Sequence, residues 1–174
     1  MSFYRLGCKK TKLDAKHEIL MTPLFPKEIN TSKPHRYSAL VGVGSNIKKP
    51  LDRFKKLYFF LSKEAYIQPL CTYPILKNPP FGYINQPYFY NTLIEISTDL
   101  PPKALLKRLL RIESKFGRKR SFKNAPRTLD LDIIFFENFV MYNKSLKLPH
   151  PEWANRASVL VPMTYQRSKL KWKK

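Results

Sequence analysis

The chain has little of the chemistry that builds disulfide frameworks or membrane spans. It contains only two cysteines, Cys8 and Cys71, which lie far apart without metal-ligand spacing. This usage favours a reduced, cytoplasmic setting over a disulfide-stapled secreted domain. No apolar stretch approaches the ~20 residues that a membrane span needs, and the basic N-terminus lacks the apolar run of a secretory signal. We therefore expect a cytoplasmic protein with no membrane partner.

Acidic residues are also scarce. The 174 residues include 33 Lys and Arg but only 12 Asp and Glu, for a formal net charge of +21. Such a charge attracts phosphorylated ligands and polyanions, including nucleic acid. The basic residues are spread along the whole chain, however, which also fits a lysine-rich surface with no specific nucleic-acid partner. With 43% apolar and 14% aromatic residues, the length predicts one folded domain.

The chain divides into three parts. Residues 1–35 form a basic extension with several prolines, in which residues 12–21 could make a short helix. Residues 36–164 carry the periodic segments of a folded domain, and residues 165–174 form a basic tail that we expect to fray. Within the domain the hydrophobic pattern predicts, in order, a strand, a helix, two strands, a helix and a strand, at residues 37–43, 50–64, 66–76, 88–97, 101–116 and 128–136.

Small residues follow the first predicted strand. Gly42 and Gly44 resemble the start of a dinucleotide-binding motif, but the third glycine of that motif is missing, and there is no phosphate-binding loop. We interpret the glycines as positions where the backbone passes close to another group. Asn46 is a candidate N-cap for the helix that follows.

The last predicted strand carries two carboxylates. With a period of two, Leu129, Leu131, Ile133 and Phe135 face a core, whereas Thr128, Asp130, Asp132 and Ile134 face the other way. The Cα atoms of Asp130 and Asp132 would lie ~6.6 Å apart, so their charges repel unless a cation lies between them. Oxygen-only ligands favour Mg²⁺ shared with phosphates, although a solvated strand edge is the alternative. Asparagine at either position should relieve the repulsion when no metal is bound.

Two further segments offer ligand-binding groups. Phe89 and Asn91 share a strand face and could stack on and hydrogen-bond a flat polar ring, unless Asn91 is only an exposed loop residue. The basic loop at residues 118–127 leads into the aspartate strand, and it is either a polyphosphate clamp or a solvated turn. His150, between two prolines, is either structural or a phosphate ligand.

Several motifs occur in a fixed order within residues 37–163. They are Gly44-Ser45-Asn46, Pro80-x-Gly82-x-x-x-Gln86-Pro87-x-Phe89-x-Asn91, Glu113-x-x-x-Gly117-Arg118-x-Arg120, Pro126-Arg127-Thr128-Leu129-Asp130-Leu131-Asp132 and Leu148-Pro149-His150-Pro151, with Arg156 beyond. Together they resemble the 6-hydroxymethyl-7,8-dihydropterin pyrophosphokinases of folate biosynthesis. The string from Pro126 to Asp132 is highly specific to that family.

The resemblance implies an α+β, ferredoxin-like fold, in which an antiparallel sheet has helices over one face. It implies transfer of the β,γ-diphosphate of ATP to the hydroxymethyl oxygen of the pterin, which leaves AMP. The partners would be ATP and the pterin, the cofactor two Mg²⁺ ions, and the expected state a monomer. A nucleic-acid-binding module on a ferredoxin-like sheet and a relative that binds nucleotide without transfer are the competing interpretations.

The family's functional residues carry over to defined positions. The resemblance assigns the metals to Asp130 and Asp132, which form the catalytic set with Arg118 and Arg127. It assigns ATP binding to Glu113, Arg118, Arg120, Arg127, His150 and Arg156. It assigns the pterin to Pro80, Phe81, Gly82, Phe89, Asn91 and Asp130. The loops at residues 78–87 and 118–126 are expected to be mobile without ligand and to close over it.

Overall fold

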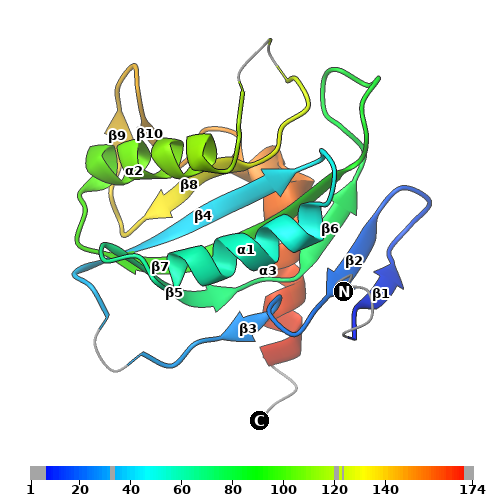
Figure 1. The fold of residues 1–174 in the computed structure, drawn as a ribbon, viewed down its shortest axis with the longest axis horizontal. Coiled ribbons are helices and arrows are strands. Elements are labelled where there is room, and N and C mark those ends of the chain that lie inside the picture. The colour runs from blue at the N-terminus through cyan, green and yellow to red at the C-terminus, as the bar shows by residue number, and fades with distance from the viewer. Residues whose placement is uncertain (1–6, 32–33, 120–121, 123, 171–174) are drawn as a thin grey trace.

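A computed structural model describes residues 7–31, 34–119, 122 and 124–170. Its central unit follows the predicted order of strands and helices (Figure 1), and every strand pairing in it is antiparallel. The strand order is β8-β4-β7, with β5 and β6 sharing the far side of β7. The elements are β4 (Tyr37–Ser45), α1 (Pro50–Leu61), β5 (Ile67–Thr72), β6 (Ile75–Asn78), β7 (Phe89–Thr98), α2 (Pro102–Lys115) and β8 (Asp130–Phe136). The ferredoxin-like α+β fold is confirmed.

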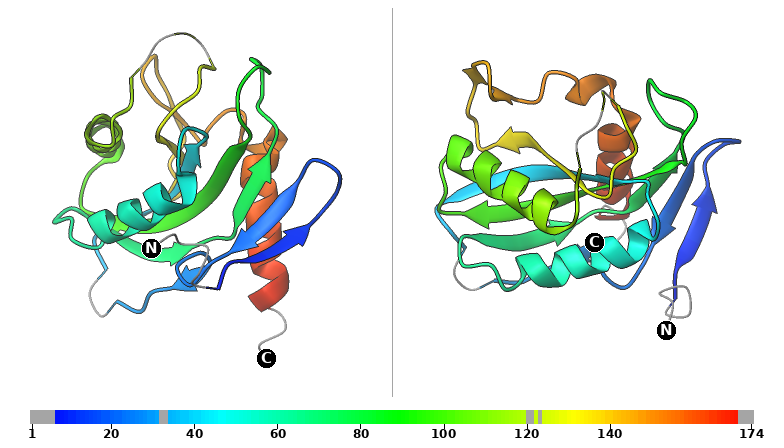
Figure 2. Two further views of the ribbon diagram at one scale, coloured as in Figure 1. Left: turned by 45° about the vertical axis from the view of Figure 1, so that its right-hand side comes forward. Right: turned by 45° about the horizontal axis from the view of Figure 1, so that its top comes forward.

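Helices α1 and α2 cover one face of this sheet and enclose the main core (Figure 2). Both begin with a proline in the first turn, which has no N–H to leave unpaired. Gly117, at φ +79°, ends α2 in the left-handed conformation that glycine adopts most readily. The apolar side chains that these helices bury are Leu51, Phe54, Leu57, Tyr58, Leu61, Leu105, Leu109 and Ile112.

A third helix covers the opposite face, where the sequence predicted none. Helix α3 (Ala157–Leu170) follows a short 3₁₀ turn, η2 (Trp153–Asn155). Val159 of α3 packs on Leu40, Leu93 and Ile134 of three adjacent strands. The segment predicted to fray after Tyr165 is therefore helical as far as Leu170. The sheet lies between helices on both sides, as Figure 2 shows.

The N-terminal extension adds strands to the sheet instead of a helix. Strand β1 (Lys9–Lys12) forms a hairpin with β2 (Glu18–Met21), which pairs with β6, and β3 (Lys27–Glu28) pairs with β5. The short helix expected at residues 12–21 is wrong. Asp14 closes the turn by accepting the N–H groups of Lys16 and His17, and the pairing with β6 buries Ile19 and Leu20. Local propensity could not reveal that distant partner.

Two strand predictions change in detail. The strand expected at residues 66–76 is divided at Tyr73 and Pro74 into β5 and β6. In β8, Leu40 pairs with Phe135 but Val41 pairs with Ile133, so Ile134 is the extra residue of a β-bulge. The alternation therefore shifts, and Phe136 enters the main core in place of Phe135. Phe135 packs on Trp153 instead, with ring centres 4.9 Å apart.

After β8 the chain forms a two-stranded hairpin, β9 (Met141–Tyr142) with β10 (Lys147–Leu148), before it reaches α3. No helix in the described part of the chain is both long enough and apolar enough to cross a membrane.

Candidate active site

Two glycines of β4 form the floor of a small cavity between the sheet and the start of α3. Gly44 pairs with Asn91 on one side and Asp130 on the other, and Gly42 pairs with Asp132. A Cβ atom on Gly44 would lie 2.9 Å from Asn91 Oδ1, which is too close for any other residue without movement. The predicted close approach of the backbone is confirmed. The cavity measures about 50 Å³, and Arg156, Ser158 and Val159 line its α3 side.

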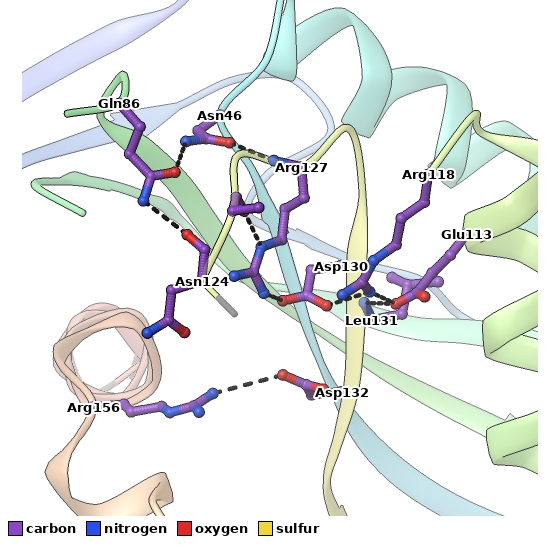
Figure 3. A network of polar contacts seen from close by, with 11 residues as sticks. Asn46, Gln86, Glu113, Arg118, Asn124, Arg127, Asp130, Leu131, Asp132 and Arg156 are labelled. Atoms are coloured by element: carbon purple, nitrogen blue, oxygen red, sulfur yellow. Dashed lines mark hydrogen bonds and ion pairs between the residues drawn. The ribbon is translucent and has the colours of Figure 1, made fainter. Parts of the chain in front are cut away.

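Asp130 is held by two arginines (Figure 3). Its Oδ1 accepts from Arg118 Nη1 and its Oδ2 accepts from Arg127 Nη1, each at 2.5 Å. These charge-assisted bonds come from the two ends of the loop that joins α2 to β8, Arg118 just after the helix and Arg127 just before the strand. Aspartate and arginine, predicted as parts of one site, do lie together, and their opposite charges offset one another.

Glu113 lies beneath this pair and is only 2% exposed. Its Oε1 accepts from the N–H of Leu131, at 2.7 Å, and from Arg118 Nη1. Burial raises the pKa of Glu113, while the Leu131 N–H and Arg118 oppose that rise. The expected direct contact with ATP does not fit this burial, because the carboxylate is directed at the strand that carries the aspartates.

Asp132 is paired much more loosely. Among the described residues its ion-pair partner is Arg156, whose Nη1 lies 3.6 Å from Asp132 Oδ2, and both side chains are 42% exposed. Burial and the charge of Asp130 raise the pKa of Asp132 above its ordinary value. Within the described residues, no group of three or more His, Cys, Asp or Glu side chains could hold a metal alone. A cation here would depend on these two carboxylates and on a ligand's oxygens.

Asn46 joins the two loops that border the site. It is 3% exposed, and its Oδ1 accepts from the N–H of Arg127 at 2.8 Å while its Nδ2 donates to Gln86 Oε1 at 2.8 Å. Gln86 Nε2 in turn donates to the carbonyl of Asn124 at 3.0 Å, and Figure 3 shows the connected network. The prediction that Asn46 caps α1 is wrong, since α1 has no side-chain cap.

The residues predicted to bind the pterin are only partly assembled. Phe89 lies beneath Arg127, whose guanidinium carbon is 5.6 Å from the ring centre. Asn91 faces the cavity and donates from Nδ2 to Asn78 Oδ1 at 2.7 Å. Phe81 is 89% exposed, so its ring points into solvent. Neighbouring Gly82, at φ +81°, lies directly against Asn124.

His150 and Arg120 complete the predicted set. The backbone N–H of His150 donates to Ile134 of β8 at 2.9 Å, and its Nδ1 accepts from the N–H of Glu152 at 3.2 Å. Burial, with the charge of Arg156, lowers the pKa of His150. Arg120 lies outside the residues that the structure describes.

The sequence did not predict a role for three residues near the site, Asn78, Gln86 and Asn124. Their hydrogen bonds join separate loops and strands, and no periodic sequence pattern indicates such contacts. Gln86 alone had a signal, since it belongs to the Gln-Pro-x-Phe-x-Asn motif. A larger hollow of about 340 Å³ lies at the start of α1, but none of the predicted site residues lines it.

Comparison with known proteins assigns the family. The model of the 7,8-dihydro-6-hydroxymethylpterin-pyrophosphokinase family matches residues 40–166. A 2-amino-4-hydroxy-6-hydroxymethyldihydropteridine pyrophosphokinase of Helicobacter pylori is 41% identical over 152 residues, which cover 86% of this chain and 93% of the relative. The enzyme of the same name from Campylobacter jejuni is 43% identical, over 81% of this chain and 88% of the relative. The chain therefore belongs to the 7,8-dihydro-6-hydroxymethylpterin-pyrophosphokinase family and is a pyrophosphokinase of folate synthesis.

Proposed function

We propose that diphosphate transfer takes place in the cavity above Gly42 and Gly44. There ATP gives its β- and γ-phosphates to the hydroxymethyl oxygen of 6-hydroxymethyl-7,8-dihydropterin and leaves as AMP. The observation that carries this proposal is that one small cavity is lined by the side chains of Asp130, Asp132, Asn91 and Arg156. Such a constellation suits a reaction in which positioning and charge neutralisation do most of the work.

The donor set fits Mg²⁺. Asp130 and Asp132 offer only oxygen ligands, and the raised pKa of Asp132 records both burial and a neighbouring negative charge that a cation would offset. We propose that these two residues hold two Mg²⁺ ions together with the phosphates of ATP. When bound, the ions would neutralise phosphate charge and orient the attacking and leaving oxygens.

The arginines provide the second set of positive charges. Arg118 and Arg127 each hold one oxygen of Asp130, and Arg156 lies beside Asp132. We propose that Arg118, Arg127, Arg156 and His150 bind phosphate oxygens of ATP, and that Arg120 also binds ATP. A planar guanidinium binds phosphate with paired hydrogen bonds, so each residue would fix orientation as well as charge. Glu113 would hold Arg118 in place and would not touch ATP.

The pterin would bind on the β7 side of the cavity. Asn91 would hydrogen-bond the ring edge, and Phe89 would stack on the ring face once Arg127 moves from it. The backbone at residues 80–82 would close the pocket, because Gly82 already lies against the loop that precedes Arg127. Closing both loops would exclude water, which would otherwise compete with the hydroxymethyl oxygen.

We also propose that residues 36–164 are sufficient for catalysis and that the protein works as a cytoplasmic monomer. Residues 1–35 would serve as a sheet extension, since β1–β3 add only to its β5–β6 side. Binding of nucleic acid is the second candidate function, supported by the +21 charge. We expect such binding to be weak and steeply salt-dependent. Tight, sequence-selective binding of RNA or DNA oligomers at physiological salt would favour this second function instead.

AMP release is the direct test of the residue assignments. The measurement compares AMP formed from ATP with and without the pterin and Mg²⁺, for the wild type, Asp132→Asn and Asp99→Asn. Asp99 is a matched control because it pairs with His35 and the Arg36 N–H, away from the cavity. We expect a loss of activity of at least about a hundredfold in Asp132→Asn and almost none in Asp99→Asn. Equal activity in all three proteins would contradict the metal assignment.

A further inference from the structure

Two asparagines on adjacent strands form a fixed chain of amides. Asn78, at the end of β6, and Asn91, on β7, lie diagonally opposite on one sheet face, because Leu76 pairs with Asn91 and Asn78 pairs with Phe89. Asn91 Nδ2 donates to Asn78 Oδ1 at 2.7 Å. Asn78 Nδ2 donates to the carbonyl of Pro79 at 2.8 Å.

This chain fixes which way both amides point. The carbonyl of Pro79 can only accept, so it selects the Nδ2 end of Asn78. Asn78 therefore presents its Oδ1 to Asn91, and only Nδ2 of Asn91 can pair with it. Asn91 Oδ1 is left above Gly44, where a Cβ atom would be 2.9 Å away, in the floor of the cavity. Asn91 Oδ1 can therefore accept a hydrogen bond from a ligand, and the second N–H of Asn91 Nδ2 can donate one.

We propose that Asn78 is a positioning residue that makes the site selective for the lactam edge of a pterin. The inference rests on the proposed function, in which Asn91 contacts the ring. A 4-oxopterin presents an N3–H donor beside the O4 acceptor, which match Oδ1 and Nδ2 of Asn91 as Asn78 holds them. A 2,4-diaminopteridine presents an N3 acceptor beside an amino donor, and it needs the reversed amide. Reversal breaks the bond to Asn78 and sets two oxygens against each other.

The binding of two ring types tests this inference. The probes are 6-hydroxymethylpterin and 2,4-diamino-6-hydroxymethylpteridine, and Kd is measured from their fluorescence with Mg²⁺ and a nonhydrolysable ATP analogue present. The quantity compared is the ratio of the two dissociation constants in the wild type, Asn78→Ala, Asn78→Leu and Asn78→Asp. Two apolar variants are used so that the test can still be made if one of them fails to fold. Thermal melting verifies that each variant is folded.

We expect the preference for the oxo ring to fall about fivefold in Asn78→Ala and Asn78→Leu, the change of one neutral hydrogen bond. Asn78→Asp should keep the preference, because its carboxylate still accepts from Asn91 Nδ2 and cannot pair with Oδ1. An unchanged ratio in a folded Ala or Leu variant, or an equal loss in Asn78→Asp, overturns the inference while the proposed function stands. Failure of the wild type to bind either probe overturns the proposed function as well.

Discussion

Asp130 and Asp132 lie two residues apart on one strand face, yet their electrostatic surroundings differ sharply. Arg118 and Arg127 each donate to one oxygen of Asp130 at 2.5 Å, whereas Asp132 has one ion pair among the described residues, with Arg156 at 3.6 Å. Two arginines therefore neutralise the charge of Asp130, whereas the charge of Asp132 is only weakly offset by Arg156. The two residues should serve the same metals but affect folding in opposite ways.

Replacing each aspartate by asparagine should separate these two effects. In EDTA, Asp130→Asn should lower the free energy of unfolding by about 1–3 kcal/mol, because it weakens charge-assisted bonds to both arginines. Asp132→Asn should raise the melting temperature, because it removes a poorly compensated charge. The expectation that both substitutions relieve repulsion is thus reversed for Asp130. A stabilising Asp130→Asn substitution would show that the arginines are not bound to it.

The raised pKa of Asp132 predicts a pH dependence in the metal-free protein. An acid whose pKa is raised by folding binds more protons in the folded state than in the unfolded state, so its ionisation opposes folding. As the pH is lowered from neutral through the acidic range in which Asp132 takes up its proton, this penalty should disappear. The advantage in melting temperature of Asp132→Asn over the wild type should shrink over that range in EDTA. An advantage that grows as the pH falls would be the opposite result.

Glu113→Gln tests positioning from beneath the site. The amide oxygen can still accept from the Leu131 N–H, but the ion pair with Arg118 is lost. We expect kcat to fall about 10–100-fold, as for other groups that orient metal-site residues, with less change in the KM for ATP. Glu64→Gln is the matched control, because Glu64, which follows α1, forms an ion pair with Arg108 of α2, the helix that also carries Glu113. A kcat loss in Glu64→Gln equal to that in Glu113→Gln would assign both to general destabilisation.

Asn46→Ala should loosen both loops together. It removes the acceptor of the Arg127 N–H and the donor to Gln86, and we expect a loss of about 1–3 kcal/mol in unfolding free energy. Amide hydrogen exchange should speed up at residues 79–88 and 124–127 in the same variant. In Asn143→Ala, which removes a comparable side-chain acceptor in the turn between β9 and β10, exchange there should not change. Faster exchange in only one loop would argue against coupling through Asn46.

The functional strands could be predicted from the sequence because they follow a simple period. Asp130 and Asp132 do share a face with Asn91 and Phe89, opposite the side chains of the main core. The motifs placed the arginines at the same site, but they did not predict that Arg118 and Arg127 would each donate to a different oxygen of Asp130. The chain order of strands and helices was likewise readable from hydrophobic alternation and helix-starting prolines.

What could not be predicted depends on partners far away in sequence. The bulge at Ile134 follows from register against β4, and the β1–β2 hairpin follows from pairing with β6. Asn46 is a residue type that often caps helices, but here its buried side-chain amide hydrogen-bonds Gln86 and Arg127, which lie on two different loops. Asn78 is the last residue of β6 and precedes two prolines, so no local pattern reveals that its side chain accepts a hydrogen bond from Asn91.

The identity of the products distinguishes diphosphate transfer at this site from other reactions of ATP. Wild-type protein is incubated with ATP, Mg²⁺ and 6-hydroxymethyl-7,8-dihydropterin, and the phosphorus nuclei are followed by ³¹P NMR. We predict one AMP for each pterin diphosphate, because the β- and γ-phosphorus atoms of ATP are transferred together. No AMP should form when the pterin is omitted. Formation of ADP with a pterin monophosphate, or AMP formation without pterin, would contradict diphosphate transfer at this site.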